Sequence, residues 1–471
     1  MNRKEFLFRL GLLTSLGVLL PNVLSSCQND EEEEEFAPDY KGALNEDVVT
    51  NSENASKTVV VVGAGIAGLA AATRLKKYGF HVIVIEGRDR IGGRILTDKS
   101  WGIPADMGAS WIHGPSGNPI SYIVDKAKIN TYLTNDEDLI IYDQEGKEIN
   151  EDIMDEYFEK YESLLDEIED KQLKGVSLRD AIQNINPAYL NDIKMIYQLS
   201  AYAEFDAGGP IEELDAAYWE DDLNYKGKDV LFPNGYDAVI NYLSQGLDIV
   251  LNQKVEKIDY TGSKTEITTD KAVYNADAVI VTVPLGVLKK NTITFSPSLP
   301  PQKISAINRL KMGYVNKVFL KFPSTFWDNQ QYIGFTSEIK GKFNYFLNAN
   351  KFAPNSHILL TFGFGNYGLE IENKTDEAIQ DEIMTILKKI YGSDIPNPDS
   401  ILVSRWNSDP FSYGAYSFVN VGASSDDFNI IAESVDNKLY FAGEHTSKEY
   451  RGTVHGAFAS GQREADKIGK K

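Results

Sequence analysis

The chain has 471 residues, 42% of them hydrophobic and 25% charged, which is an ordinary globular composition with enough length for two or three packed domains. Its net charge of −22 disfavours nucleic acid as a partner, because a phosphate backbone must be neutralised by Lys and Arg. The same charge would either concentrate a cationic substrate at the surface or serve solubility alone. The five histidines and the single cysteine form no cluster with metal-ligand spacing, so we expect no metal site.

Residues 1–27 have the pattern of an export signal. Basic residues come first, an apolar stretch follows, and the LSSC run ending at Cys27 resembles a bacterial lipobox, in which the cysteine is acylated and becomes the mature N-terminus. The pattern predicts a signal peptide with a lipobox. It also predicts an exported, membrane-anchored bacterial lipoprotein on the periplasmic or cell-surface side, with the lipid as its sole membrane contact. A plain secretory signal and an N-terminal membrane anchor stay open as alternatives.

Residues 28–56 carry an acidic block and few apolar side chains. Such a segment buries too little apolar surface to offset its ordering entropy, so it is predicted to be a disordered acidic tether.

The run TVVVVGAGIAGLAAATRLKKYGFHVIVIE, residues 58–86, predicts a dinucleotide-binding unit. A buried strand leads into a G-x-G-x-x-G turn made by Gly63, Gly65 and Gly68, which opens an alanine-rich helix. The turn glycines allow backbone amides and the helix N-terminus to approach a pyrophosphate. A second strand then ends in Glu86, which is placed to accept hydrogen bonds from a ribose.

The residues after Glu86 narrow the cofactor. The sequence EGRDRIGGR resembles the FAD-binding opening of the flavin amine oxidase superfamily. The resemblance implies that Arg88, Gly93 and Arg94 lie beside the cofactor, with an arginine helping to neutralise its phosphates.

Three separated segments, residues 57–117, 225–290 and 401–471, are expected to form one α/β, Rossmann-type FAD-binding domain. The second segment holds a strand pair at 249–258, whose Val255 could lie against adenine, and an apolar strand at 278–283. The third holds a strand at 439–442 and a helix from about residue 453.

Residues 118–224 and 291–400 are predicted to form an α+β substrate-binding domain, a mixed sheet with helices. The first insertion has helical periodicity, as in MDEYFEKYESLLDEIED. The second reads as strands followed by the helix EAIQDEIMTILKKIYG.

The resemblance to the flavin amine oxidases extends over nearly all of the chain after residue 57, through the blocks GASWIHGPSGNPI, NKVFLKF, WNSDPFSYGAYSF and AGEHTSKEYRGTVHGAF. The first block is most similar to polyamine and spermine oxidases, and histone lysine demethylases are the next most similar group. The resemblance implies a flavoenzyme that removes a hydride from the carbon next to an amine nitrogen, with O2 as acceptor. Ala415 stands where monoamine oxidases carry a flavin-linking cysteine, so FAD should be bound non-covalently.

The same resemblance assigns four catalytic candidates. Lys317 matches a lysine that holds a water beside flavin N5, and Tyr416 matches one wall of an aromatic cage. Thr453 replaces the second tyrosine wall of monoamine oxidases, which favours an extended amine. His113 and Glu204 are candidates for polar contacts to the substrate, Glu204 as the carboxylate for a distal ammonium.

Further residues are implied to line the cofactor. These are Gly108, Ala109, Ser110, Trp111, Trp406, Gly443, Glu444, Thr453 and Val454.

The leading hypothesis is a polyamine oxidase that acts on a small cationic amine and O2 and releases hydrogen peroxide. An L-amino-acid or monoamine oxidase remains open, although the first block offers no arginine for a substrate carboxylate. A desaturase-type or protoporphyrinogen-type oxidase would share only the FAD fingerprint. The alternative that is not an enzyme is a surface lipoprotein that binds FAD without turnover.

Overall fold

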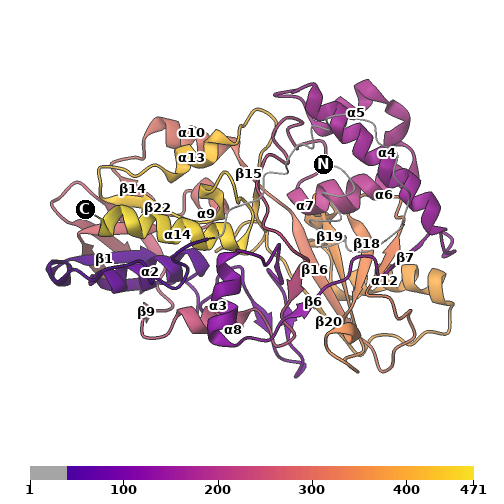
Figure 1. Ribbon diagram of the computed structural model, residues 1–471, viewed down its shortest axis with the longest axis horizontal. Helices are drawn as coiled ribbons and strands as arrows, with labels where there is room; N and C mark the ends of the chain where they lie inside the picture. Colours follow the sequence, from indigo (N-terminus) through magenta and orange to yellow (C-terminus); the bar gives the residue numbers. More distant parts are fainter. Residues whose placement is uncertain (1–39, 471) are drawn as a thin grey trace, which may run out of the picture.

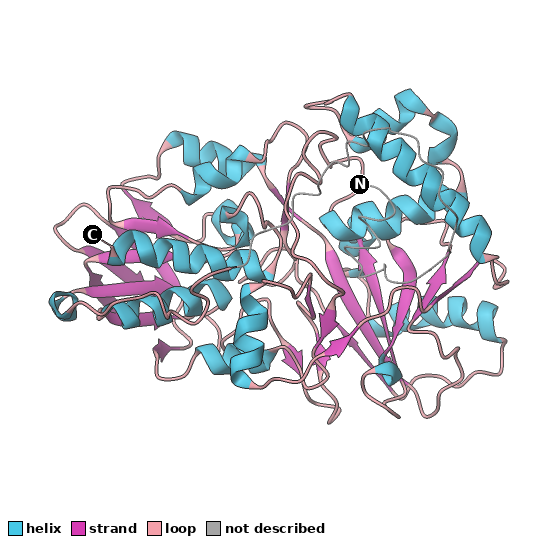
Figure 2. Ribbon diagram, in the orientation of Figure 1, coloured by secondary structure: helices cyan, strands magenta, loops and turns pink. Residues whose placement is uncertain are grey.

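The computed structural model describes residues 40–470, which form two lobes side by side along the long axis (Figure 1). One lobe contains β1, α2 and α14, and the other contains β16, β18 and β19 beneath α4, α5 and α6. Each lobe has a sheet at its centre and helices packed over it (Figure 2). Within residues 40–470 no helix has the length and apolar content needed to span a membrane. The predicted signal peptide and lipobox lie outside the described residues.

A parallel sheet of five strands forms the core of the first lobe, in the order β22-β13-β1-β2-β9. The strands are β1 (Thr58–Val62), β2 (His81–Ile85), β9 (Asp248–Val250), β13 (Ala278–Val281) and β22 (Leu439–Phe441). The Val- and Ile-rich strands β1 and β13 are buried because helices and loops cover both faces of the sheet. Three distant segments thus meet in one sheet, as the sequence predicts.

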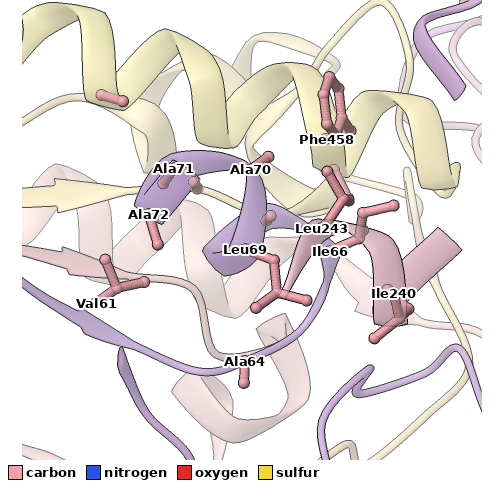
Figure 3. Packing of buried hydrophobic residues seen from close by; sticks show 14 of the residues in the cluster. Val61, Ala64, Ile66, Leu69, Ala70, Ala71, Ala72, Ile240, Leu243 and Phe458 are labelled. Carbon is pink, nitrogen blue, oxygen red and sulfur yellow. The ribbon is translucent and has the colours of Figure 1, made fainter. Parts of the chain in front are cut away.

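Two helices, α2 (Ile66–Tyr78) and α14 (Val454–Gly469), pack against each other on this sheet. The small side chains of Ala70 and Ala71 allow the close approach of the helix axes (Figure 3). Figure 3 also shows Phe458 of α14 and Leu243 of α8 (Asp237–Leu243) beside α2. The alanine-rich composition of α2 therefore reflects packing on several sides.

A second sheet in this lobe has the order β12-β11-β10-β14. Its strands are β10 (Val255–Asp259), β11 (Thr265–Thr269), β12 (Val273–Ala276) and β14 (Thr294–Ser296). The predicted strand pair at 249–258 is wrong, because β9 and β10 belong to different sheets.

The second substrate insertion begins later than predicted. Strand β14 pairs with β10, and α10 (Pro301–Arg309) packs against α13 (Asp426–Ala432) and α9 (Leu285–Lys289). Residues 294–309 therefore belong to the dinucleotide lobe, because their apolar side chains complete its second hydrophobic cluster.

The second lobe is built on a mixed six-stranded sheet in the order β20-β16-β19-β18-β17-β7. Its strands are β7 (Leu139–Tyr142), β16 (Val315–Lys321), β17 (Tyr332–Phe335), β18 (Lys342–Asn348), β19 (Ile358–Phe364) and β20 (Ser400–Val403). Strand β7 comes from the insertion that periodicity marked as helical. The helices of the second lobe are α4 (Glu151–Asp170), α5 (Leu178–Ile185), α6 (Ile193–Gln198), α7 (Phe205–Ala207), α11 (Gly365–Ile371) and α12 (Asp376–Tyr391).

Other elements are one helix and several short strands. They are α3 (Pro119–Ala127), β3 (Thr97–Asp98), β4 (Ala105–Asp106), β5 (Trp111–Ile112), β6 (Tyr132–Leu133), β8 (Val230–Leu231), β15 (Lys311–Met312) and β21 (Ser417–Phe418). One-turn elements are η1 (Ser52–Ser56), η2 (Pro187–Leu190), η4 (Ala349–Lys351), η5 (Glu444–Thr446) and the π-helical η3 (Leu199–Glu204).

Residues 40–56 are packed on the dinucleotide lobe, which corrects the prediction of a disordered tether through residue 56. The Tyr40 hydroxyl donates to Gln462 Oε1 at 2.9 Å. Asp47 accepts two hydrogen bonds from the buried Arg74 of α2, at 2.9 and 2.6 Å, and Arg74 also pairs with Asp466 of α14. Composition alone missed this order because the partners of Asp47 lie on the folded domain.

Arg74→Met is expected to lower the free energy of unfolding by about 3 kcal/mol, because it leaves two carboxylates around a buried site without their counterion. The hydrogen bonds of Arg74 lower the pKa of Asp47, and they outweigh burial to lower the pKa of Asp466. The contribution of Arg74 to the free energy of unfolding should therefore be present at neutral pH and decline as the pH falls through these lowered pKa values.

Chemical denaturation at pH 7 and pH 3 measures the effect. Lys470→Met is the control, because Lys470 donates to the same Asp466 from an exposed position, at 2.8 Å, and should cost under about 1 kcal/mol. Equal losses for the two variants would contradict the prediction.

Candidate active site

A cavity of about 500 Å³ runs from the glycine turn of the dinucleotide lobe to the sheet of the second lobe. Both lobes line it: Gly63, Gly65 and Glu86 from one, and Lys317, Tyr345 and Phe362 from the other. A cavity of this kind, at a domain junction, is the usual place for a cofactor and its substrate.

The glycine turn is an open cradle. A Cβ at Gly65 would meet no protein atom within 4 Å, so the backbone there is free to contact a ligand. Gly63 has a φ of 109°, and a Cβ at Gly68 would lie 2.0 Å from the carbonyl oxygen of Gly63. Gly68 thus sets the helix close to the turn, and the N-terminus of α2 faces the place where phosphates would bind.

The far end of the cradle is shaped by Glu86 and Arg88. Glu86 accepts hydrogen bonds from the backbone amides of Ala64 and Arg88, at 2.8 and 2.9 Å. Arg88 makes a two-bond ion pair with Asp409 at 2.9 and 2.7 Å, and its guanidinium lies over the Phe411 ring at 5.0 Å. The structure brings Arg88 to the cavity, where Val255 also lies, but its charge is already matched by Asp409.

Arg94 and Glu444 form a buried ion pair in the middle of the cavity wall. Arg94 Nη1 donates to Glu444 Oε1 and to the Ala415 carbonyl, each at 2.8 Å. Burial raises the pKa of Glu444, but Arg94 outweighs it, so the pKa is lowered and the carboxylate is ionised. The predicted Gly93 and Gly443 lie in the same wall.

The N-terminus of α14 also faces the cavity. Thr453 caps it by accepting from the Gly456 amide at 2.9 Å, and both Thr453 and Val454 line the cavity. The positive end of this helix favours negative charge on whatever lies against it.

Lys317 is buried on the inner strand β16 with its ammonium group surrounded by oxygen atoms. Nζ donates to the carbonyl oxygens of Asp106 at 3.0 Å and Gly108 at 2.6 Å, and also to Ser110 Oγ. Burial lowers the pKa of Lys317 to about 7, against the opposing charge of Asp106. An edge-strand lysine facing solvent is therefore excluded.

Aromatic side chains form the walls around Lys317. Its Nζ lies 5.0 Å from the centre of the Trp111 ring and 5.9 Å from that of Phe362. Trp406 donates from Nε1 to the Met107 carbonyl at 3.1 Å. A Cβ at Gly108 would lie 1.8 Å from the carbonyl oxygen of Arg94, so Gly108 is required there.

Tyr416 lies in the same lining, and its hydroxyl donates to the carbonyl of Phe205 at 2.6 Å. Burial raises the pKa of Tyr416 far above its usual range, so the ring stays neutral. Ala109 and Ser110 complete this part of the lining, where Ala415 also lies.

Carboxylates gather around His113 in the cavity lining. His113 Nδ1 lies 2.6 Å from Asp229 Oδ2, and Asp229 Oδ1 accepts from the Gly114 amide at 3.0 Å. Burial alone would lower the pKa of His113, but Asp229 outweighs it and the pKa is raised. The His113 side chain is 56% accessible because it opens onto the cavity.

Asp136 lies beside this pair and hydrogen-bonds with Tyr332. Burial, and then the charge of Asp229, raise the pKa of Asp136 to about 7. Among the described residues no group hydrogen-bonds to its Oδ2. Sequence reasoning missed Asp136, Asp229 and the cavity-lining Asp206, although Asp229 gives a weak signal as an acid directly before an apolar strand.

Glu204 does not reach the cavity, which corrects the expectation of a substrate carboxylate there. It ends the π-helical turn η3, is 1% exposed, and accepts from Lys340 at 2.7 Å and from the Ile211 amide at 3.0 Å. The turn directs Asp206, rather than Glu204, to the cavity. Within residues 40–470 no three acidic, His or Cys side chains gather in a way that could hold a metal ion.

A Rossmann-type cradle that continues into an aromatic chamber defines a dinucleotide-dependent oxidoreductase. The sequence profile of the family "Flavin containing amine oxidoreductase" matches residues 66–469, and the chain belongs to this family. Its cofactor is FAD, and its general reaction is amine oxidation. The open cradle at Gly65, the α14 N-terminus and the acid Glu86 fit FAD. No cysteine lies among the described residues, so no thioether link to FAD is available there.

Relatives of known name are similar over most of the chain. Polyamine oxidase 4 of Oryza sativa subsp. japonica is 37% identical over 88% of this chain and 89% of its own length. Lysine-specific histone demethylase 1 homolog 2 of Arabidopsis thaliana is 35% identical over 88% of this chain and 59% of its own. The solved structure of wild-type putrescine oxidase bound to putrescine has the same fold, with a TM-score of 0.73 at 21% identity, over 88% of this chain and 99% of that one.

Proposed function

We propose that this protein is a polyamine oxidase. It takes a hydride from the carbon next to an amine nitrogen of a substrate with two or more amines, and water hydrolyses the resulting imine to an aldehyde and a shorter amine. FAD, held along Gly65, Glu86 and the N-terminus of α14, would supply the hydride acceptor, and O2 would take up the two electrons and two protons to give hydrogen peroxide. One O2 and one water are consumed for each bond cleaved.

The observation that supports an extended, multiply charged substrate is the acidic end of the cavity. Asp136 and Asp229 lie there beside His113, away from the Arg94–Glu444 pair, whose charges match each other. A substrate with one ammonium at this end would place its other nitrogen toward the aromatic chamber. A monoamine would bring no second ammonium to Asp136, whose Oδ2 has no hydrogen-bond partner among the described residues.

The aromatic chamber supports the chemistry of the reacting nitrogen. An amine must lose its proton before hydride can leave, and the Trp111, Phe362 and Tyr416 walls disfavour the ammonium form by desolvation. Lys317 shares this chamber and can exchange a proton near neutral pH. We assign it to proton exchange beside the reacting centre.

Peroxide release with a panel of amines tests the proposal. Spermine, spermidine or putrescine should be turned over with a kcat/KM at least about tenfold above that of benzylamine or an L-amino acid, which is a difference of about 1.4 kcal/mol. A preference for benzylamine or an amino acid would replace this function with the corresponding oxidase. If no amine bleaches the flavin, the protein binds FAD without turnover.

For the N-terminal region the proposal is an exported lipoprotein anchored through Cys27. Labelled fatty acid should be incorporated into the full chain expressed in a bacterium, and Cys27→Ala should abolish the label. A labelled Cys27→Ala chain, or an unlabelled parent, would contradict the anchor.

A further inference from the structure

Three oxygen atoms surround Lys317 Nζ and are called the oxygen cradle below. One of the three differs chemically from the other two. Two of the three acceptors are the carbonyl oxygens of Asp106 and Gly108, which accept hydrogen bonds and cannot donate. The third is Ser110 Oγ, a hydroxyl that does both. Ser110 is 5% exposed, so water does not replace it easily.

The number of donors on Nζ changes with its protonation state. The ammonium form has three N–H donors and therefore fills all three oxygens of the cradle. The neutral amine has two donors and one lone pair, so it satisfies both carbonyls and needs a donor at the third position. A hydroxyl that rotates about its C–O bond supplies that donor without movement of any heavy atom.

We propose that Ser110 is a positioning residue for Lys317, whose hydroxyl accepts from the ammonium form of Nζ and donates to its amine form, so that Lys317 keeps one place in both states. The inference rests on the proposed role of Lys317 beside FAD, and it adds a proton-dependent partner to that role. No proton leaves Ser110 for good: the hydroxyl hydrogen only changes the atom it faces. In the amine state that hydrogen points to Nζ, and in the ammonium state it turns away.

The groups that face Lys317 are few. Asp106, on β4, is the charged side chain that acts on Nζ among the described residues, and the faces of Trp111 (β5) and Phe362 (β19) are uncharged. The Asp106 carboxylate is itself held by Thr97 Oγ1 and by the Tyr236 amide, and Asp237 acts on it from α8. Burial lowers the pKa of Lys317 and the charge of Asp106 opposes this, so the amine state of Nζ is more accessible than in an exposed lysine.

Ser110→Ala should destabilise the ammonium form of Lys317 more than the amine form. The ammonium form loses a charge-assisted hydrogen bond and the amine form loses a weaker neutral one, so the titration midpoint of Lys317 should fall by about one pH unit. The midpoint is read from the ¹³Cε resonance of the FAD-loaded protein labelled with [ε-¹³C]lysine, with the Lys317→Met spectrum identifying the signal. This readout needs no amine, so it is independent of the proposed substrate.

Ser110→Thr keeps the hydroxyl and should keep the midpoint, and Ser110→Cys, a weak donor and acceptor, should shift it in the direction of Ser110→Ala. Ser404→Ala is the matched control, since Ser404 Oγ accepts from the backbone amide of Lys317 at 2.7 Å and is not part of the cradle. It should leave the midpoint in place.

A second readout uses the rate at which O2 reoxidises the dithionite-reduced enzyme as a function of pH. Its inflection should move with the NMR midpoint in each Ser110 variant. An unmoved midpoint in both Ser110→Ala and Ser110→Cys would overturn the inference, and so would an equal shift in Ser404→Ala. Failure of every amine to turn over would instead count against the polyamine oxidase assignment and leave the NMR result standing.

Discussion

Lys317→Met is expected to lower the rate constant for flavin reduction or for its reoxidation by O2 by about 100-fold, while FAD stays bound. The side chain lies among three oxygen atoms and two aromatic rings, in a place that only the ammonium or amine group can satisfy. A positioned group that exchanges protons is typically worth 10²- to 10⁴-fold, and methionine has a similar length but no exchangeable proton.

Stopped-flow absorbance separates the two half-reactions, and the ratio of flavin to protein absorbance reports FAD content. Lys321→Met is the control, because Lys321 lies on the same strand, four residues on, and outside the cavity lining. It should change neither half-reaction by more than about twofold. If Lys317→Met is as fast as the parent in both half-reactions, the role assigned to Lys317 is wrong.

The dinucleotide cradle could be predicted from the sequence because its determinants are local. The strand, the glycine turn and α2 are set by neighbouring residues, and β1, α2 and β2 occur where the run around Gly63 predicts them. Lys317 became a candidate through the family resemblance. Its position on an inner strand, between β19 and β20, depends on sheet order, which periodicity does not contain.

The acidic end of the cavity could not be predicted, because its members come together only in three dimensions. Asp136 follows a short strand of one insertion and Asp229 precedes β8, and neither belongs to a motif. The prediction that Glu204 contacts the substrate was wrong for a different reason. The direction of a helical side chain depends on the local winding, and the π-helical turn η3 directs Glu204 to Lys340 and away from the cavity.

The ordered structure of residues 40–56 was missed because the prediction used only the low apolar content of the segment and did not consider its partners on the folded domain. Disorder follows from composition when a segment has nothing to bind, but Asp47 has a buried arginine to pair with. Arg74 was itself visible in the sequence, as a charge inside an alanine-rich helix. A buried arginine requires a carboxylate, and the acidic segment upstream supplies one.

Asp136→Asn is expected to raise the KM for a triamine or tetramine by about 10- to 100-fold and to leave kcat at saturation within about threefold. The change removes a negative charge beside Tyr332 and His113, and it leaves Lys317 and its oxygen partners in place, so it should weaken binding of a distal ammonium and spare the chemical step. A monoamine such as benzylamine has no second ammonium for Asp136 to bind and should lose no more than about twofold in kcat/KM.

The KM of the parent for a polyamine should also change with pH in a defined direction. Because burial and Asp229 raise the pKa of Asp136 to about 7, the carboxyl group is largely neutral at pH 6 and largely ionised at pH 8. The parent's KM for a polyamine should therefore fall between pH 6 and pH 8, while the polyamine's own nitrogens stay mostly protonated. In Asp136→Asn that fall should be absent or reduced to the part contributed by His113.

Glu137→Gln is the matched control, because it removes the same charge from the adjacent, exposed residue, which does not line the cavity. It keeps the net charge of the protein equal to that of Asp136→Asn, so a general loss of attraction for cations would appear in both variants. An equal rise in KM for the two would assign the effect to long-range charge, which salt screens, and would refute a local ammonium site. A rise confined to Asp136→Asn that persists at about 0.5 M salt would require direct contact between this carboxylate and the substrate, since exposed charges farther apart than a Debye length no longer interact under those conditions.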